Sequence, residues 1–406
     1  MNGSYNFVVF LDADWDMRGS RNRQHFLIRE IARLIEGKGK VLAIERPVCL
    51  AAGLFWQRAK FFDWLKCKRG LRRESENLFI YTPFICLHNV LAASVPWLTK
   101  LNRLLMKWQV KRLLNKLNFR HESLVGWIHH PYQLEDVGVA NEKVLVYDCF
   151  DDYSSNVKEK QLTNLKQREN TVLSCADAVF VVSEKLLRVM EDRAKHVHLV
   201  PNGADVELFA KAMNTETEIP SEISMLPHPL IGFVGKVTAR LDFELLARLA
   251  VSHPEWSLVF VGMYEGESKL SGLPGYQLFR QAPNVFFFGS KPYPSLPGYL
   301  KAFDVCIIPY LLEGQNPCCS PLKLYEYLAT GKPIVSVNIP HVASFVPLVR
   351  VAHNAEEFER NIEEALAEKD NNLRHQRLAI ARMNSWNRRA EKALKIIERK
   401  LEEKAV

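Results

Sequence analysis

The stretch Val305-Cys-Ile-Ile-Pro309, followed by Ser320-Pro-Leu-Lys-Leu-Tyr-Glu-Tyr-Leu-Ala-Thr-Gly331 and Ile334-Val-Ser-Val337, has the pattern of a strand, a helix and a second strand. Ser320 suits an N-cap, Pro321 the first helical position and Gly331 the C-cap. Short apolar strands connected by a helix indicate a parallel sheet that is covered on both faces.

The same alternation of apolar strands and helical patterns runs along the whole chain. The expected strands of a first series are Tyr5–Leu11, Val41–Glu45, Leu78–Tyr81, Leu124–His129, Val144–Cys149, Ala178–Ser183 and Val197–Val200. Those of a second series are Leu230–Val234, Ser257–Val261, Val285–Phe288, Val305–Pro309 and Ile334–Val337. We therefore expect an α/β protein with two Rossmann-like doubly wound domains facing a cleft.

The domain boundaries follow from a change in composition after the first series. Residues 206–228 are rich in Thr, Glu, Ser, Pro and Asn, which is typical of a linker. The predicted domains are residues 1–205 and 229–384. A final charged helix at 385–406 is free to pack back on the first domain.

Composition indicates a globular protein in a reducing compartment. The 406 residues are 48% hydrophobic and 25% charged, and the eight cysteines form no CxxC pair, which suits buried free thiols. The residues after Phe7–Leu11 are acidic rather than apolar, so no export signal is expected. We expect a cytoplasmic protein, without a zinc site and peripheral on the inner face of the cytoplasmic membrane if it binds lipid.

The net charge of +8 is unevenly distributed. Residues 1–120 contain 22 Lys and Arg against 9 Asp and Glu, whereas the rest contain 32 against 37. A basic first half favours an anionic membrane surface or a phosphorylated acceptor as partner. Nucleic acid is not expected, because base-stacking aromatic patterns and recognition motifs are missing.

The helix that begins near Ser320 is a candidate anion site. The loop before it leaves a strand, so free backbone N–H groups and the positive end of the helix dipole meet there. Lys323 adds a full charge in the first turn, and Glu326 lies on the same face, where a carboxylate accepts hydrogen bonds from ribose hydroxyls. An ordinary surface helix with an ion pair is the alternative.

The segment Pro321-Leu-Lys-Leu-Tyr-Glu-Tyr-Leu-Ala-Thr-Gly-Lys-Pro-Ile-Val335 resembles the donor-site signature of family 4 glycosyltransferases, retaining enzymes with the GT-B fold. It is most similar to the bacterial branch that builds surface and extracellular polysaccharides. Further pieces occur in the family's order: Asp12-Ala-Asp-Trp15, Arg23-Gln-His25, His130-Pro-Tyr132, Tyr147-Asp-Cys-Phe-Asp-Asp152, Val181-Val-Ser-Glu184, Pro201-Asn-Gly-Ala-Asp205 and Arg240-Leu-Asp-Phe-Glu-Leu-Leu246.

The resemblance implies a donor site in the second domain. Its expected residues are Lys236, Arg240, Ser320, Leu322, Lys323 and Glu326. Arg240 is preferred to Lys236 as the phosphate ligand, because Arg240-Leu-Asp242 fits the pattern of the bacterial branch, and a guanidinium binds phosphate oxygens in a bidentate manner. A solvated basic loop is the alternative. The family has two glutamates separated by seven residues, and the second matches Glu326. Counting back places the first at Cys318, which cannot act as a carboxylate, so the polar Gln315–Asn316 loop is the alternative contact for the sugar.

The first domain supplies the expected reacting and acceptor side. The resemblance places His130 beside the transferred sugar, and a structural histidine is the alternative. Together with His130, the cations Arg240 and Lys323 are the predicted catalytic groups. On the acceptor side we expect Arg21, Arg23, His25, Asp151 and Asp152. The basic residues suit the entry of a lipid diphosphate or form a solvated helix start, and the two acids also suit a loop cap.

These residues predict a retaining glycosyltransferase that moves a sugar from a nucleotide diphosphate donor to a glycan or lipid-linked acceptor, without a cofactor or metal. No Asp-x-Asp follows a strand of the second domain to hold a metal on the diphosphate. The alternatives are a catalytically degenerate nucleotide-sugar-binding subunit, which the cysteine at 318 favours, and another GT-B enzyme such as a nucleotide-sugar epimerase.

Two segments predict that the first domain docks on an anionic membrane. Residues 54–65 are rich in aromatic side chains and precede a basic cluster at 66–73. In the second segment Leu98, Leu101, Leu105 and Trp108 recur at helical spacing beside Lys100, Arg103, Lys107 and Lys111. The pairing suits a helix in the headgroup region, and a core helix with a solvated basic face is the alternative.

Overall fold

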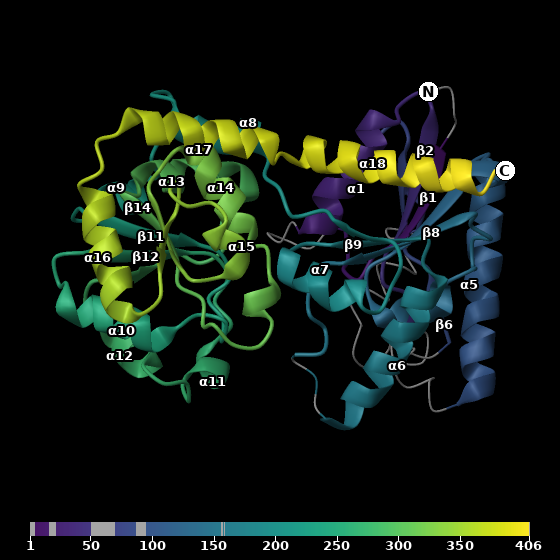
Figure 1. Cartoon of the computed structure of the whole chain (residues 1–406), viewed down its shortest axis with the longest axis horizontal. Coiled ribbons are helices and arrows are strands. Elements are labelled where there is room, and N and C mark those ends of the chain that lie inside the picture. Colours follow the sequence, from purple (N-terminus) through teal and green to yellow (C-terminus); the bar gives the residue numbers. More distant parts are fainter. Residues whose placement is uncertain are drawn as a thin grey trace.

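The computed structural model describes residues 5–15, 22–49, 70–86, 95–155, 157 and 159–405, which form two α/β domains side by side (Figure 1). In the first domain the sheet order is β10-β9-β8-β7-β1-β2-β5-β4, and only β4 runs antiparallel to its neighbour. The strands are β1 Tyr5–Phe10, β2 Gly39–Ile44, β4 Arg72–Arg73, β5 Leu78–Tyr81, β7 Leu124–Ile128, β8 Val144–Cys149, β9 Ala178–Val181 and β10 Val197–Leu199. A separate parallel pair joins β3 Val48–Cys49 and β6 Phe84–Ile85.

Helices cover both faces of this first sheet. They are α1 Arg23–Leu34, α5 Pro96–Lys116, α6 Glu159–Cys175 and α7 Glu184–Glu191. Helix α1 packs on one face with side chains such as Phe26 and Ile31. Helices α5, α6 and α7 pack on the other, where Val110 of α5 is buried against strand residues such as Leu42. The apolar runs of the strands are therefore buried from both sides.

The second domain has a parallel sheet in the order β13-β12-β11-β14-β15-β16. Its strands are β11 Leu230–Val234, β12 Ser257–Val261, β13 Val285–Phe287, β14 Val305–Ile308, β15 Ile334–Val337 and β16 Arg350–Ala352. Its helices are α10 Phe243–Ser252, α11 Glu267–Leu270, α12 Tyr276–Gln281, α13 Leu296–Ala302, α14 Leu322–Thr330, α15 Pro340–Ala343, α16 Ala355–Leu366 and α17 Asn371–Met383. The expected fold class, two Rossmann-like doubly wound domains, is confirmed. Strand β16, which the sequence did not predict, extends the sheet by one position.

Residues 206–228 differ from the expected linker. They form α8 Val206–Phe209, a 3-10 turn at Ala210–Met213 and α9 Ser221–Ser224. Phe209, Ala212 and Ile223 are buried in the core of the second domain. The polar composition of the segment obscured these three apolar anchors, which bury enough surface to hold the segment on the domain.

The C-terminal helix, α18 Trp386–Glu403, lies along the first domain (Figure 1). The chain crosses between the domains at two adjacent places, because Ala204 and Ser385 form a parallel bridge. Trp386 then stacks on Phe26 of α1 with the ring centroids 5.3 Å apart. Ala390, Ala393 and Ile397 continue the contact as part of the first domain's core. The last helix thus fastens the end of the chain to the domain in which it began.

Candidate functional site

Each sheet has one point at which the strand order reverses, and the candidate site lies between these two points. β1 has β2 on one side and β7 on the other, and β11 has β12 and β14. Ligands of open parallel sheets bind beyond the carboxyl ends of such strands. The carboxyl ends of both sheets meet at the domain boundary, where Ser183 Oγ after β9 donates a 2.6 Å hydrogen bond to the backbone oxygen of Cys318 after β14.

Two cations of the second domain share one aromatic ring at its reversal point. Lys323 Nζ lies 4.7 Å from the ring centroid of Tyr310, just after β14, and the Arg240 guanidinium lies 5.2 Å from the same ring. The Lys323 ammonium donates to the Tyr310 hydroxyl, and Arg240 Nε donates a 2.6 Å hydrogen bond to Asn316 Oδ1. Both hydrogen bonds go to neutral oxygens. Lys323 is only 8% exposed, whereas Arg240 is half-buried and interacts electrostatically with Asp151 of the first domain.

The turn after β11 brings backbone close to this pair. Gly235 has φ +154°, and a Cβ at this position would lie 3.1 Å from Cε and Nζ of Lys323. Glycine at this position leaves room for the lysine and exposes the backbone to a ligand. Lys236, the next residue, is exposed to solvent. The structure therefore brings Arg240, but not Lys236, to the Tyr310 ring.

Glu326 lies one turn further along α14 and is 9% exposed. Tyr293 Oη donates a 3.3 Å hydrogen bond to its Oε1. Burial raises the pKa of Glu326 to about 7, although the neighbouring Lys323 acts in the opposite direction. A carboxyl group at this pKa exists in both protonation states near neutral pH. In its ionised state it accepts hydrogen bonds from hydroxyl groups of a ligand.

The start of α14 differs from the expected cap. The helix begins at Leu322, Pro321 occupies the N-cap position and no side chain caps the helix. Ser320 instead connects the two domains, because Asn202 Nδ2 donates a 2.6 Å hydrogen bond to the Ser320 backbone oxygen. Its hydroxyl lies 3.1 Å from the Tyr325 hydroxyl. Tertiary partners thus replaced the local cap. The expected C-cap Gly331 is confirmed, with φ +70°.

Leu322 and Cys318 face the first domain. Leu322 packs against that domain's apolar core and so supports the helix start. Cys318 is 6% exposed, and burial raises the pKa of its thiol, a trend to which Asp152 and Asp151 add. The position therefore holds a neutral thiol beside two acids of the other domain.

Asp151 and Asp152 follow β8. Asp152 Oδ1 accepts hydrogen bonds from the backbone and the hydroxyl of Ser154, at 3.0 and 2.6 Å, so it caps its own turn. Burial raises the pKa of Asp151 to about 6, while Arg240 across the boundary lowers it. Asp151 is thus within electrostatic reach of the second domain's cation pair, whereas Asp152 is occupied locally.

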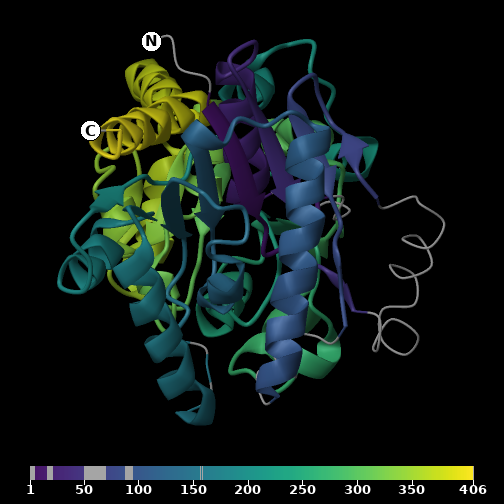
Figure 2. The same cartoon turned by 90° about the vertical axis from the view of Figure 1, so that its right-hand side faces the viewer.

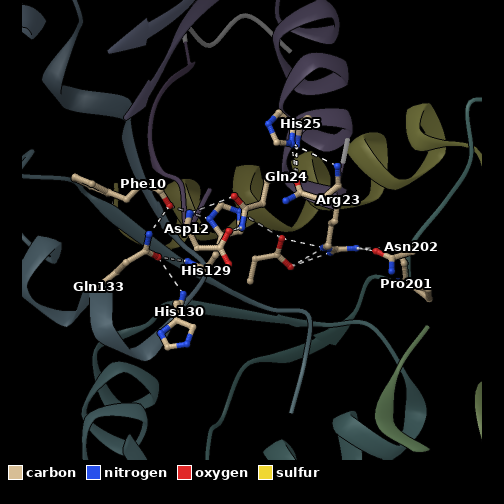
Figure 3. Close-up of polar contacts among 12 residues, drawn as sticks. Phe10, Asp12, Arg23, Gln24, His25, His129, His130, Gln133, Pro201 and Asn202 are labelled. Carbon is tan, nitrogen blue, oxygen red and sulfur yellow. Dashed lines mark hydrogen bonds and ion pairs between the residues drawn. The ribbon is translucent and has the colours of Figure 1, made fainter. Parts of the chain in front are cut away.

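The expected basic rim of the first domain is instead a buried network (Figure 3). Arg23 is 3% exposed, and its Nε and Nη2 atoms bind the carboxylate of Asp148 at 2.9–3.1 Å. Its Nη1 donates to the Pro201 backbone oxygen at 3.1 Å and to Asn202 Oδ1 at 3.3 Å. Arg23 therefore does not lie at an open rim, as the sequence led us to expect, because its guanidinium is enclosed by partners from two segments.

His25 is buried as well, at 1% exposure, against the ring of Trp15. Its Nδ1 lies 2.6 Å from Asn22 Oδ1, and its Nε2 lies 3.3 Å from the backbone oxygen of Asp14. Burial lowers its pKa, so the ring is neutral and structural. Arg21 lies outside the described residues.

The two adjacent histidines after β7 have different environments (Figure 3). His129 is fully enclosed: its Nδ1 donates a 2.9 Å hydrogen bond to the Phe10 backbone oxygen, and its Nε2 lies 3.8 Å from Asp148 Oδ2. His130 Nδ1 accepts a 3.1 Å hydrogen bond from the Tyr132 backbone N–H, and its ring packs on Tyr132 and Tyr153. Burial lowers the pKa of His130 to about 4, so a neutral imidazole carries its proton on Nε2.

Several residues of this region were not predicted as site residues. Tyr310 organises both cations, Asn202 bridges the domains and Gln24 donates to the carboxylate of Asp12. Tyr310 directly follows an apolar strand, and Asn202 lies in the Pro-Asn-Gly turn after β10. Position at a strand's carboxyl end was therefore the available signal. Within the described ranges, no group of three or more His, Cys, Asp or Glu side chains is arranged to hold a metal ion.

Comparisons with known proteins agree with this geometry. Residues 228–368 match the family described as Glycosyl transferases group 1. The matched segment includes strand β14, helix α14 with Lys323, and strand β15. The chain is 27% identical over 259 residues to a putative teichuronic acid biosynthesis glycosyltransferase, TuaH, of Bacillus subtilis, covering 60% of this chain and 64% of that protein. It is 28% identical over 144 residues to the putative glycosyltransferase EpsF of the same organism, covering 35% of this chain and 36% of EpsF.

The chain thus matches less than two thirds of the length of either relative. Among solved structures, sucrose-phosphate synthase from Thermosynechococcus elongatus superposes with a TM-score of 0.69 at 15% identity, covering 97% of this chain and 98% of that one. At this identity the likeness concerns the fold. Residues 228–368 thus resemble the family Glycosyl transferases group 1, and the two-domain architecture of the chain is the GT-B fold.

Proposed function

We propose that this chain is a retaining glycosyltransferase of polysaccharide biosynthesis that takes a sugar from a nucleoside diphosphate donor. The observation that carries the proposal is the pair of cations, Lys323 and Arg240, held around Tyr310 at the reversal point of the second sheet. A diphosphate supplies negative charge to the buried Lys323, whose hydrogen bond goes to the neutral Tyr310 hydroxyl, and to the half-buried Arg240 beside it. The name of one bacterial relative, the putative teichuronic acid biosynthesis glycosyltransferase TuaH, supports the polysaccharide context.

The donor nucleotide fits the rest of α14. With its diphosphate at Lys323 and Arg240, its ribose lies toward Glu326, one turn further along the helix. The ionised carboxylate accepts hydrogen bonds from the ribose hydroxyls. Tyr293, which donates to the same carboxylate, fixes its orientation. The free N–H groups at the uncapped start of α14 add a second source of positive potential.

The proposed chemistry relies on charge stabilisation at the departing diphosphate. As the sugar–phosphate bond breaks, negative charge grows on the phosphate oxygen, and Lys323 and Arg240 stabilise it. The acceptor hydroxyl attacks from the same face, and its proton passes to that phosphate oxygen. Retention of the anomeric configuration follows from this path. The mechanism requires no metal, because the two cations supply the charge that a metal would supply.

His130 has the form of a neutral hydrogen-bond donor in this scheme. The Tyr132 backbone fixes its Nδ1 as acceptor, which leaves the Nε2–H to contact a sugar hydroxyl. Asp151, which interacts electrostatically with Arg240 across the domain boundary, suits a hydroxyl of the acceptor. A glycan or a lipid-linked glycan is the proposed acceptor.

The test is a binding and turnover screen with nucleoside diphosphates and their sugars. Calorimetry identifies the base, and analysis of products distinguishes transfer from isomerisation. Lys323→Ala and Glu326→Ala should each weaken binding by about 1.5–3 kcal/mol, with unchanged circular dichroism. Lys369→Ala, an exposed lysine of the same domain, is the control.

Three outcomes would revise the proposal. Equal affinity in all variants would remove the donor site from α14. An isomerised sugar would identify an epimerase. Binding without any product, in the presence of glycan acceptors, would identify a nucleotide-sugar-binding subunit, which the thiol at Cys318 would then explain.

A further inference from the structure

Helix α5 lies on the outer side of the first domain, away from the second domain (Figures 1 and 2). One side of the helix is bound to the domain. Met106, Val110 and Leu114 are buried in its core, and the amide of Gln109 bonds to the backbone oxygen of Phe84 at 2.9 Å. These contacts fix which side of the helix faces solvent.

The opposite side carries large apolar side chains in contact with water. Trp97 is 67% exposed, Leu101 37%, Leu104 65% and Trp108 55%. Their spacing of three and four residues places them in one stripe along about three turns of the helix. We refer to these four residues as the α5 stripe. The stripe expected from the sequence included Leu98 and Leu105, but both are half-buried on the flank.

Every charged residue of α5 is basic. The helix contains Lys100, Arg103, Lys107, Lys111, Arg112 and Lys116, all of them exposed, and no Asp or Glu. At 100° per residue, Lys100, Lys107 and Lys111 fall on one side of the stripe and Arg112 on the other. The Arg112 guanidinium lies 5.7 Å from the ring centroid of Trp108. Cations therefore border the apolar side chains on both sides.

We propose that the α5 stripe and its basic borders are a docking surface for an anionic lipid bilayer. Tryptophan and leucine enter the boundary between headgroups and acyl chains, while long lysine side chains reach back to the phosphates. Because the helix contains no Asp or Glu, its charge is complementary to that of an anionic leaflet, which is negative throughout. Among the helices that the structure describes, none is long and apolar enough to span a bilayer, so the contact is one of lying on the surface.

The position of α5 connects this surface to the acceptor side. Arg103 donates a 2.9 Å hydrogen bond to the backbone oxygen of Val137, directly after the 3-10 turn Pro131–Asp136 that His130 caps. The N-terminal half of the helix, with Trp97 and Leu101, thus lies at the end of the domain that carries the candidate site. A docked bilayer would present a lipid-linked acceptor at this end, and only that consequence depends on the proposed function.

The test is co-sedimentation of the full chain with vesicles of neutral phosphatidylcholine and with vesicles that also contain phosphatidylglycerol. We expect binding to the anionic vesicles at low salt and at least a tenfold weaker partition at high salt. Trp97→Ser with Trp108→Ser, and separately Lys100→Glu with Lys107→Glu, should each lower the partition coefficient at least tenfold. All four side chains are exposed, so folding should be preserved.

The matched controls change similar side chains on the second domain. Met225→Ser with Leu278→Ser removes side chains that are 86% and 56% exposed, and Lys211→Glu with Lys369→Glu makes the same change of charge. Controls that lose as much binding as the α5 variants would overturn the proposal, as would failure to sediment with anionic vesicles at low salt. The affinity for nucleotide is measured on the same α5 variants. An unchanged affinity would show that the loss of vesicle binding does not come from damage to the donor site.

Discussion

In the first domain the buried cation at the carboxyl end of the sheet is Arg23, and its guanidinium is bound to the Asp148 carboxylate and to two oxygens of the Pro201–Asn202 turn. In the second domain the corresponding cation, Lys323, donates to the neutral hydroxyl of Tyr310. Both are nearly buried, at 3% and 8% exposure. Burial of a charge is costly in each case, but only Arg23 has a carboxylate as its direct hydrogen-bond partner, whereas Lys323 donates to a hydroxyl and has Glu326 as a neighbouring charge.

This difference separates a structural charge from a charge that suits a ligand. The Arg23–Asp148 pair joins α1, β8 and the first crossing between the domains, so it holds the architecture. Lys323, whose hydrogen bond goes to a neutral hydroxyl, suits a negatively charged group of a ligand, which is the donor diphosphate in the proposed function. Whether a charged residue at the end of a strand has a structural or a binding role therefore depends on which groups of the protein it contacts.

The largest expected effect comes from breaking the buried pair in the first domain. Arg23→Ala leaves the Asp148 carboxylate, which is fully buried, without its cation. We expect the free energy of unfolding to fall by about 3–5 kcal/mol. Urea unfolding followed by circular dichroism measures this change. The control is Arg33→Ala, whose exposed pair with Glu30 is worth at most about 0.5 kcal/mol. A similar fall in the free energy of unfolding in both variants would show that burial does not determine how much an ion pair contributes to stability.

The second effect concerns the cation beside Tyr310. Arg240→Ala should raise the dissociation constant of the donor nucleotide sugar by about 10- to 100-fold, because a charge-assisted contact is lost. Stability should change little. Lys236→Ala, four residues earlier and exposed, should leave the constant within about threefold. Calorimetry on both variants makes the comparison, and a larger loss for Lys236→Ala would reverse the assignment.

A smaller effect should appear in the pH dependence of binding. The pKa of Glu326 is raised to about 7, so its ionised fraction falls by about tenfold between pH 8 and pH 6. If ribose binds the ionised form, the affinity for the nucleotide sugar should weaken as the pH falls through 7. Glu326→Gln should remove that dependence. A pH profile of the same slope in the variant would assign the titration to another group.

The smallest effect is expected at His130. The loss of one neutral hydrogen bond in His130→Ala should lower turnover by about two- to tenfold while the affinity for the nucleotide sugar stays the same. His130→Gln, which keeps an N–H donor, should restore part of the turnover. Initial rates at saturating donor measure the change. Full turnover in His130→Ala would leave the residue as a cap of its 3-10 turn.

Sequence patterns predicted the main strands and the helix at 322–330 to within about two residues, because apolar strands between helical segments leave few alternatives. They also placed Lys323 and Glu326 on one face, since three residues make nearly one helical turn. Helix α14 has side chains such as Leu324 and Leu328 in the core, which fixes that face toward the domain boundary.

The sequence by itself determined the fold class, the resemblance to a glycosyltransferase family and the position of the helix that carries the candidate donor site, because these depend on local periodicity and on ordered motifs. Tertiary structure alone decided the partners of the charges. Arg23 meets Asp148 across 125 positions of sequence, and Ser320 meets Asn202 across 118. No local pattern reports such contacts, so an arginine expected at an open rim lies inside the protein, and a serine expected to cap a helix joins two domains. The exposed side of α5 was also decided by tertiary structure. The helix has apolar residues on two faces, and only the folded structure shows which face packs against the core.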